Sequence, residues 1–252
     1  MANECILGTG LTTGTFIKTA SPQIVEILGT TGLDFAIIDA EHAPFDRGLL
    51  DIMLLGGRAA RLPLLVRIPD TAPATILSVL DMGAAGILVP HVDSAGEAKD
   101  IVARARYHDG VRGFSGSPRF AGYGGMSMSA ALELGDKSVI MCQIESSGGL
   151  AGAAAIAATP GVDALFIGRA DLALAMGFKD IRVPQVTAAT IAIIRAARAA
   201  NKIAAMFVPS IAERDQFAAE GASCFVIGSD QSLLQQAAQA LATRVPPPPP
   251  QT

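Results

Sequence analysis

The types and spacing of Glu145 and Asp171 are those of a divalent-metal site. Each follows a short apolar run that predicts a β-strand, and the two runs are consecutive along the chain. On neighbouring strands the two carboxylates could approach one another, and two such ligands, completed by water and substrate, are typical of Mg²⁺ or Mn²⁺. Zinc is disfavoured because no Cys or His accompanies the pair. For Asp171 a helix N-cap or a salt-bridge partner is the alternative, because the segment 172–176 is helical in character.

His42 and Arg67 are candidates for acid–base and oxyanion chemistry. His42 follows Glu41 directly beyond a predicted strand, and a histidine beside a carboxylate is a candidate general base. A turn histidine that bonds to backbone is the alternative. Arg67 ends the apolar run LLVRI, where burial would be costly without an anionic partner. It could hold a substrate oxyanion, or form a structural salt bridge with an acid at a neighbouring strand end.

Two more basic residues, Lys18 and His91, also follow predicted strands but carry a weaker signal. Lys18 raises the possibility of a Schiff-base lysine. The alternative is that its ammonium reaches solvent, since Ser21 and the following proline predict a helix start close by. The sequence leaves both interpretations open.

The positions of these residues depend on the elements that carry them. Apolar runs of strand length recur along the chain, and their continuous hydrophobicity is typical of strands buried on both faces of a parallel sheet. There are eight: GTFIK (14–18), FAIID (35–39), LLVRI (64–68), GILVP (86–90), VIMCQIE (139–145), ALFIG (164–168), AAMFV (204–208) and CFVIG (224–228). Helix signals separate them, among them a capping box formed by Ser94 and Glu97.

Eight strands alternating with helices over 252 residues predict an α/β fold, a single-domain (β/α)₈ TIM barrel. A doubly wound open sheet is the alternative, but no glycine-rich dinucleotide-binding motif follows the first strand. In such a barrel the active site forms at the C-terminal strand ends, so polar residues there should converge on one mouth. They are Asp39, Glu41, His42, Arg67, His91, Gln143, Glu145, Arg169, Asp171, Ser210, Ser229 and Asp230.

Two segments interrupt the alternation. Residues 107–137 form a long, glycine-rich stretch between the fourth and fifth predicted strands, and a loop of that length is usually functional or disordered. The prolines at 246–250 must be extended polyproline and cannot be core. We therefore assign residues 1–245 to the barrel domain and residues 246–252 to a proline-rich flexible tail.

Composition restricts the class of protein further. The chain is 50% hydrophobic and 17% charged, with a mean hydropathy of +0.43, which suits one large core and excludes a disordered chain. No apolar run approaches the ~18 residues that a membrane helix needs. The net charge is −4 and there is no basic block, so nucleic acid is not an expected partner.

The cysteines and the N-terminus bear on the cellular compartment. Cys5, Cys142 and Cys224 are dispersed and lack metal-ligand spacing, which suits a reducing cytoplasm. The first ten residues lack the basic start and apolar run of a signal peptide. We expect a cytoplasmic protein that binds neither membrane nor nucleic acid.

The motifs around the candidate residues resemble those of the HpcH/HpaI aldolases. The resemblance rests on DFAIIDAEHAPFD (34–46), LLVRIP (64–69), LDMGAAGILVPHV (80–92), VIMCQIES (139–146) and GVDALFIGRADLALAMG (161–177), in order and at matching intervals. It extends over nearly the whole chain, from Gly14 to Ala242. It implies a (β/α)₈ barrel, a divalent metal (Mg²⁺, Mn²⁺ or Co²⁺) and the activity of a class II pyruvate aldolase.

The resemblance also implies a role for each matching residue. The catalytic residues would be His42 as general base, Arg67, and Asp81 in support of the histidine; Gln143, Ala170 and Asp171 would bind substrate; Glu145 and Asp171 would bind the metal. The backbone N–H groups of Ala170 and Asp171 would hold the substrate carboxylate.

Asp81 falls near the end of a helix predicted over 74–81, at the opposite end of its own barrel. Its role therefore requires a neighbouring subunit. That agrees with the homohexamer, a trimer of dimers with exchanged C-terminal helices, which the resemblance implies.

The implied reaction is reversible cleavage of a 4-hydroxy-2-oxo acid to pyruvate and an aldehyde, in aromatic or sugar-acid catabolism. An acyl-CoA lyase of the citramalyl- or malyl-CoA type and a non-catalytic oxo-acid-binding barrel are the alternatives. Arg169 stands where the family usually has Pro, and His91 stands where an apolar residue is common, so the substrate stays open. Arg119 or Arg169 would suit an acidic aldehyde.

Overall fold

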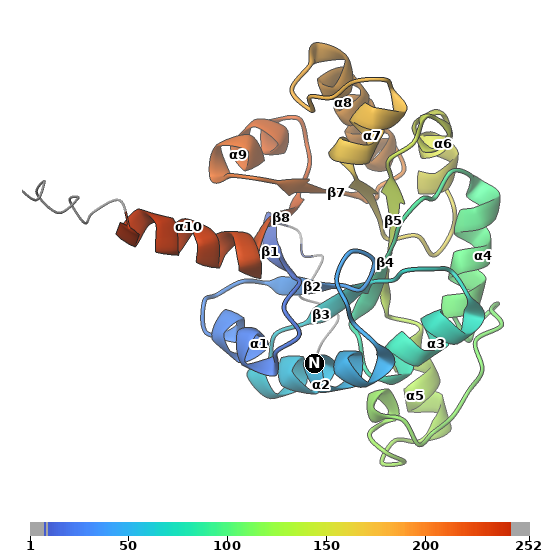
Figure 1. Ribbon diagram of the computed structural model, residues 1–252. Helices are drawn as coiled ribbons and strands as arrows, with labels where there is room; N and C mark the ends of the chain where they lie inside the picture. The colour runs from blue at the N-terminus through green and yellow to red at the C-terminus, as the bar shows by residue number, and fades with distance from the viewer. Residues whose placement is uncertain (1–7, 9, 243–252) are drawn as a thin grey trace, which may run out of the picture.

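Eight parallel strands close into a barrel in the order in which they occur along the chain, which confirms the predicted (β/α)₈ fold (Figure 1). The computed structural model describes residue 8 and residues 10–242; the proline-rich segment and Cys5 lie outside them. The strands are β1 (Thr12–Ile17), β2 (Phe35–Asp39), β3 (Leu64–Arg67), β4 (Gly86–Val89), β5 (Val139–Ile144), β6 (Ala164–Ile167), β7 (Ile203–Val208) and β8 (Cys224–Ser229). All eight predicted strands are confirmed.

Helices on the outside of the barrel connect successive strands (Figure 1). They are α1 (Pro22–Gly29), α2 (Arg47–Ala60), α3 (Pro73–Asp81), α4 (Ala95–Ala105), the 3₁₀ turn η1 (Arg119–Ala121), α5 (Met128–Gly135), α6 (Ser147–Ala157), α7 (Arg169–Ala175), α8 (Pro184–Ala199), α9 (Ile211–Ala219) and α10 (Asp230–Ala242). The capping box of Ser94 and Glu97 begins α4 as predicted. Within the described residues, no helix is both long and apolar enough to cross a membrane.

Two apolar clusters stabilise the barrel from its two sides. One has members from all eight strands and none from a helix, so it fills the barrel interior; Phe35 and Ile37 of β2 belong to it. The other joins strands to helices and includes the intervening Ala36 and Ile38. Alternate residues of each strand therefore face the interior and the helix layer. This alternation decides which side chains reach the mouth.

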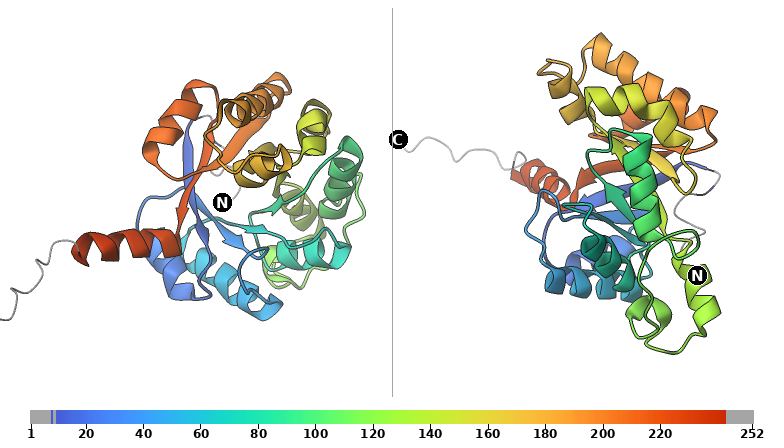
Figure 2. Two further views of the ribbon diagram at one scale, coloured as in Figure 1. Left: turned by 45° about the horizontal axis from the view of Figure 1, so that its top comes forward. Right: turned by 90° about the vertical axis from the view of Figure 1, so that its right-hand side faces the viewer.

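The segment 107–137 lies at the end of the barrel where the strands begin (Figure 2, right). The strands' C-terminal ends, from which α10 extends, are at the opposite end. The segment enters from the C-terminal end of α4 and leads into the start of β5. Of the two expectations for this segment, a functional or a disordered loop, disorder is wrong, because the segment contains η1 and α5. Ser127 caps α5 by accepting a hydrogen bond from the backbone N–H of Ala130.

The last helix, α10, projects away from the barrel (Figures 1 and 2). Beyond Ser232 its described residues are all exposed, including Leu234 at 70% and Leu241 at 67%. Leucines at such exposure on an alanine-rich helix form an apolar face that no part of the described chain covers.

The interior of β1 has no room for a side chain at Gly14. A Cβ there would lie 2.7 Å from the ring of Phe35. We predict that Gly14→Ala lowers the free energy of unfolding by about 1–3 kcal/mol through overpacking. Urea denaturation measures this change in the free energy of unfolding. Gly96→Ala is the control, because a Cβ at Gly96 has room: its nearest neighbour is the Ser94 Oγ at 3.7 Å. Equal midpoints for the two variants would contradict the prediction.

Candidate active site

The polar residues at the mouth occupy the next inward-facing positions beyond the apolar residues of the barrel interior. Because side chains two residues apart on a strand point the same way, each polar group is directed toward the barrel axis at the strand's C-terminal end. The apolar and polar partners are Phe16 and Lys18, Ile37 and Asp39, Leu65 and Arg67, and Met141 and Gln143.

A buried ion pair between Asp39 and Arg67 joins β2 to β3. The two residues are partners in the strand register. Arg67 Nε donates to Asp39 Oδ1 at 2.9 Å and Nη2 donates to Oδ2 at 2.8 Å. The guanidinium lies 4.8 Å from the ring centroid of Phe16. The predicted structural salt bridge is therefore present, and it fixes an arginine whose Nη1 takes part in none of these contacts.

Asp39 receives donors from three elements. Besides Arg67, the Lys18 ammonium lies 3.1 Å from Oδ2, and the backbone N–H of His42 donates to Oδ1 at 3.1 Å. Burial alone would raise the pKa of the Asp39 carboxyl, but the hydrogen bonds and charge of Arg67, with the other donors, outweigh it and hold the pKa below its usual value. Asp39 is therefore an ionised, fully buried anchor.

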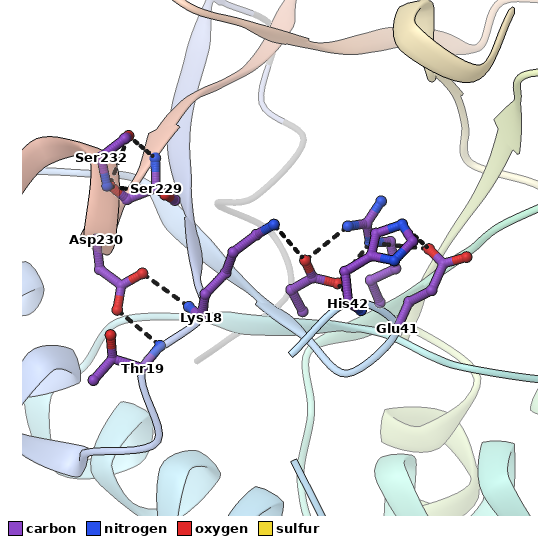
Figure 3. Close-up of polar contacts among 9 residues, drawn as sticks. Lys18, Thr19, Glu41, His42, Ser229, Asp230 and Ser232 are labelled. Atoms are coloured by element: carbon purple, nitrogen blue, oxygen red, sulfur yellow. Dashed lines mark hydrogen bonds and ion pairs between the residues drawn. The ribbon is translucent and has the colours of Figure 1, made fainter. Parts of the chain in front are cut away.

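Lys18 is itself held by the first residue of α10. The backbone N–H groups of Lys18 and Thr19 donate to Asp230 Oδ1 and Oδ2 at 2.8 and 2.9 Å. Ser229 and Ser232 exchange hydrogen bonds that close the turn into α10. Figure 3 shows Asp230 on one side of Lys18 and the turn with Glu41 and His42 on the other. These β8-end residues therefore position Lys18.

The His42 imidazole is open to the mouth. Its backbone N–H, not its ring, bonds to Asp39, so the alternative of a backbone-bonded ring does not hold. The side chain is 56% exposed, and Nε2 lies 3.7 Å from Glu41 Oε2. Glu41 Oε2 also lies 3.3 Å from Arg67 Nε. The ring thus stands beside a carboxylate, as expected of a general base.

The His91 side chain bridges two carboxylates, Glu41 in the turn after β2 and Glu145 at the end of β5. Its Nε2 lies 3.2 Å from Glu41 Oε1, and its Nδ1 lies 3.0 Å from Glu145 Oε1. The backbone N–H of His91 donates to the same Glu145 oxygen at 2.8 Å. His91 has a left-handed backbone (φ 56°). Gln143 Nε2 donates to the other Glu145 oxygen, so this buried carboxylate is fixed from both sides.

Gly168 brings the Glu145 carboxylate against the start of α7. A Cβ at this glycine would lie 2.7 Å from Glu145 Oε2. Gly168 is the N-cap residue of α7, and Asp171 lies in the first turn of that helix. Asp171 is exposed, and its carboxylate forms no hydrogen bond or ion pair with any other described residue. The N-cap and salt-bridge alternatives for Asp171 are therefore wrong.

These donors fit a divalent cation that prefers oxygen ligands. Glu145 and Asp171 supply carboxylates, and the buried Gln143 Oε1 has no hydrogen-bond partner. Residues 8 and 10–242 contain no group of three or more His, Cys, Asp and Glu that could hold a metal. The protein would thus supply two carboxylates and leave the remaining positions to water and substrate, as Mg²⁺ sites commonly do.

Two residues singled out from the sequence lie at the other end of the barrel. Asp81 ends α3 and pairs with Arg112 at 2.8 Å, so its expected distance from its own mouth is confirmed. Arg119 pairs with Asp51 at 2.8 Å and donates to the carbonyl of Met82 at 2.8 Å. The expectation that Arg119 meets an acidic aldehyde is therefore wrong for its own barrel.

Arg169 contacts side chains of α9. It is buried, its Nη2 lies 2.5 Å from Glu213 Oε2 in α9, and its guanidinium lies 4.9 Å from the Phe217 ring centroid. The alternative that Arg169 is a surface charge is therefore wrong. Ala170, the next residue, is exposed in the first turn of α7.

Sequence reasoning assigned no role to Asp39 or Asp230, which the structure places at the centre of the polar network. A signal for Asp39 was present in the alternation of β2, because Asp39 shares its face with Phe35 and Ile37. Asp230 was expected at the mouth from its place after the eighth strand, but its partners could not be predicted, because they are backbone N–H groups more than 200 residues earlier.

Comparison with known proteins defines the class of enzyme. A 5-keto-4-deoxy-D-glucarate aldolase of Enterobacter sp. (strain 638) is 35% identical over 232 residues, which are 91% of this chain and 90% of that protein. The crystal structure of a HpcH/HpaI aldolase/citrate lyase family protein from Burkholderia cenocepacia J2315 superimposes with a TM-score of 0.89 at 30% identity, over 95% of this chain and 96% of that one. The crystal structure of an HpcH/HpaI aldolase from Desulfitobacterium hafniense DCB-2 superimposes with a TM-score of 0.87 at 27% identity, over 94% of this chain and 95% of that one. The chain is a carbon–carbon lyase of the aldolase class.

The profile of one family, HpcH/HpaI aldolase/citrate lyase, matches residues 12–237. The chain belongs to this family, whose members generally depend on a divalent metal.

The contacts of Asp39 predict the effect of Asp39→Asn, a substitution that removes the negative charge between Arg67 and Lys18. We expect the free energy of unfolding at pH 7 to fall by about 3 kcal/mol, because the buried Arg67 guanidinium loses its bidentate ionic partner. Since folding lowers the pKa of Asp39, its contribution is present above its unfolded pKa of ~3.9 and is lost as the pH falls through the folded value. The difference from wild type should narrow below about pH 4.

Urea denaturation between pH 7 and pH 3 measures this. Asp180→Asn is the control, because Asp180 forms an exposed pair with Arg182, and loss of such a pair should leave the urea midpoint nearly unchanged. A difference between Asp39→Asn and wild type that does not vary with pH would contradict the prediction.

Proposed function

We propose that this chain catalyses the reversible, divalent-metal-dependent aldol cleavage of a 4-hydroxy-2-oxo acid to pyruvate and an aldehyde. The observation that carries the proposal is the contact network at one mouth that joins an open histidine, His42, and a fixed arginine, Arg67, to the carboxylate of Glu41 and, through His91, to that of Glu145. The relatives' name, 5-keto-4-deoxy-D-glucarate aldolase, supports an oxo acid of the sugar-acid class as substrate.

Glu145 and Asp171 would hold the cation, which could be Mg²⁺, Mn²⁺ or Co²⁺. When bound, a divalent cation supplies Lewis-acid polarisation of the 2-oxo group and stabilises the enolate charge. Gly168 keeps space for the Glu145 carboxylate at the start of α7. The amide of Gln143, whose oxygen has no partner, would contact substrate beside it.

The protein's own residues would bind and orient the oxo acid. The backbone N–H groups of Ala170 and Asp171 hold its carboxylate. Arg67, fixed by Asp39, donates from Nη1 to the 2-oxo oxygen, where negative charge develops as the enolate forms. A preoriented donor of this kind needs no rearrangement during the reaction, and Asp39 with Phe16 supplies that orientation.

His42 would carry the proton transfer. Its imidazole takes the proton of the 4-hydroxyl group, the oxygen forms the aldehyde carbonyl, and the C3–C4 bond breaks. The bonding electron pair remains on the three-carbon fragment as the pyruvate enolate, and protonation at C3 gives pyruvate. Glu41 lies beside the ring and orients it.

Asp81 would complete the site from a neighbouring subunit, since it lies at the far end of its own barrel. The exposed apolar face of α10 supports an assembly in which this helix packs on another subunit, and we propose a hexamer built as a trimer of dimers. We also propose a reducing cytoplasmic location. Burial raises the pKa of the Cys142 and Cys224 thiols to about 12, so both stay protonated and unreactive.

Removal of metal tests the cation requirement. Treatment with EDTA followed by dialysis should lower kcat at least tenfold while the far-UV circular dichroism stays unchanged, and Mg²⁺, Mn²⁺ or Co²⁺ should restore activity. Asp171→Asn should raise the metal concentration needed for half-maximal activity, and Asp180→Asn should not. Full activity after exhaustive metal removal would contradict the proposed mechanism.

Substitution of His42 tests the base. His42→Ala should lower kcat for aldol cleavage by about 10²–10⁴-fold with little change in stability, because the exposed ring acts in proton transfer. The wild-type enzyme, mixed with pyruvate and borohydride, should gain no covalent mass. A stable adduct on Lys18 would instead identify a Schiff-base aldolase, and undiminished cleavage by His42→Ala would exclude His42 as the base.

A further inference from the structure

His91 is a residue at the mouth to which the proposed function gives no role. Its side chain is 69% exposed, so packing does not hold the imidazole in place. Two carboxylates hold it instead: Nε2 lies 3.2 Å from Glu41 Oε1, and Nδ1 lies 3.0 Å from Glu145 Oε1. The ring therefore stands between the carboxylate beside the general base and a carboxylate of the cation site.

The backbone of His91 contributes to the same contact. Its φ of 56° lies in the left-handed region, which costs free energy at a residue other than glycine. In that conformation the His91 N–H donates to Glu145 Oε1 at 2.8 Å. One residue thus brings a backbone nitrogen and a side-chain nitrogen to the same carboxylate oxygen.

These contacts saturate one oxygen of Glu145. A carboxylate has about four lone-pair sites on its two oxygens, and it only accepts hydrogen bonds. The backbone N–H and Nδ1 of His91 occupy both sites of Oε1. Among the described residues, Gln143 Nε2 occupies one site of Oε2. A single open site therefore remains on Glu145, and it belongs to Oε2.

The oxygen with the open site is the one that faces the other carboxylate of the cation pair. A Cβ at Gly168 would lie 2.7 Å from Glu145 Oε2. Gly168 is the N-cap residue of α7, and the first turn of that helix carries Asp171. Oε1, in contrast, lies on the His91 side. Glu145 can therefore give one oxygen, and not both, to a cation held with Asp171.

The number of oxygens matters because divalent cations differ in what they accept. Mg²⁺ requires a near-ideal octahedron and usually takes one or two carboxylates together with several waters. Ca²⁺ takes about six to eight oxygens and accepts a carboxylate in bidentate form. A carboxylate restricted to one oxygen suits Mg²⁺ and lacks a ligand atom that Ca²⁺ could use.

We propose that His91 is a positioning residue that makes the cation site selective for Mg²⁺ over Ca²⁺. It occupies Glu145 Oε1 and so leaves Oε2 as a monodentate ligand in a fixed orientation. This inference rests on the proposed function in one respect, the assignment of Glu145 and Asp171 as cation ligands. It does not depend on the identity of the substrate.

Cation competition measures this selectivity without an assay of activity. The full chain, treated with EDTA and dialysed, is titrated with Mn²⁺ while electron paramagnetic resonance records the free ion. Mg²⁺ or Ca²⁺ then displaces the bound Mn²⁺ and gives a Kd for each. For wild type we expect the Kd for Ca²⁺ to lie well above that for Mg²⁺, and Asp171→Asn should weaken the binding of both.

His91→Gly removes the ring but keeps the backbone N–H, because glycine adopts a positive φ without strain. Mg²⁺ should bind about tenfold more weakly, as is typical when a group that orients a metal ligand is lost. Ca²⁺ should bind as tightly as before or more tightly, because Glu145 can then offer both oxygens. The ratio of the Ca²⁺ Kd to the Mg²⁺ Kd should therefore fall. A general loss of structure would weaken both cations and leave this ratio unchanged.

Two further variants isolate the contact made by the ring. His91→Asn supplies an amide N–H close to the place of Nδ1 and tolerates the left-handed backbone, so it should restore the wild-type ratio. Asn201→Gly is the matched backbone control, because Asn201 is exposed, has a φ of 55° and lies outside the mouth. It should leave the ratio unchanged.

Failure of this inference differs from failure of the proposed function. Cation binding by wild type, with the same Kd ratio in His91→Gly, would overturn the role of His91 and leave the aldolase proposal standing. A wild-type protein without preference for Mg²⁺, or an Asn variant that does not restore the ratio, would also overturn that role. A wild-type protein that binds none of the three cations would overturn both.

Discussion

The buried ion pair of Asp39 and Arg67 is the interaction on which the rest of the mouth depends. Removing two charges from water carries a cost that good geometry and added hydrogen bonds must offset. Here the pair is bidentate, and Lys18 and the backbone of His42 supply the added donors. Consequently one carboxylate fixes the arginine, the end of β1 and the turn that carries the histidine.

The fold was predictable because parallel barrel strands are buried on both faces and so produce unbroken apolar runs. β2 is an example: FAIID was predicted over 35–39 and is observed over Phe35–Asp39. The polar residues at strand ends were predictable for the same reason, because burial makes a charge inside such a run conspicuous. Arg67 at the end of LLVR is the clearest case.

What the sequence left open depends on contacts between distant segments. Arg169 and Asp171 are two residues apart and looked equally directed at the mouth, but the first turn of α7 sends Arg169 toward Glu213 and leaves Asp171 exposed. Residues two apart on a helix point in different directions, whereas on a strand they point the same way. The length of the segment 107–137 likewise does not reveal which end of the barrel the segment covers.

Charge at the mouth bears on why a divalent cation suits it. Asp39, Glu41, Glu145, Asp171 and Asp230 bring five carboxylates, and Lys18 with Arg67 brings two cations, which leaves an excess of three negative charges with the histidines counted as neutral. An anionic oxo acid approaching this mouth would meet like charge. A divalent cation on Glu145 and Asp171 would offset two of these three charges, so it would make the mouth able to receive its substrate as well as activate it.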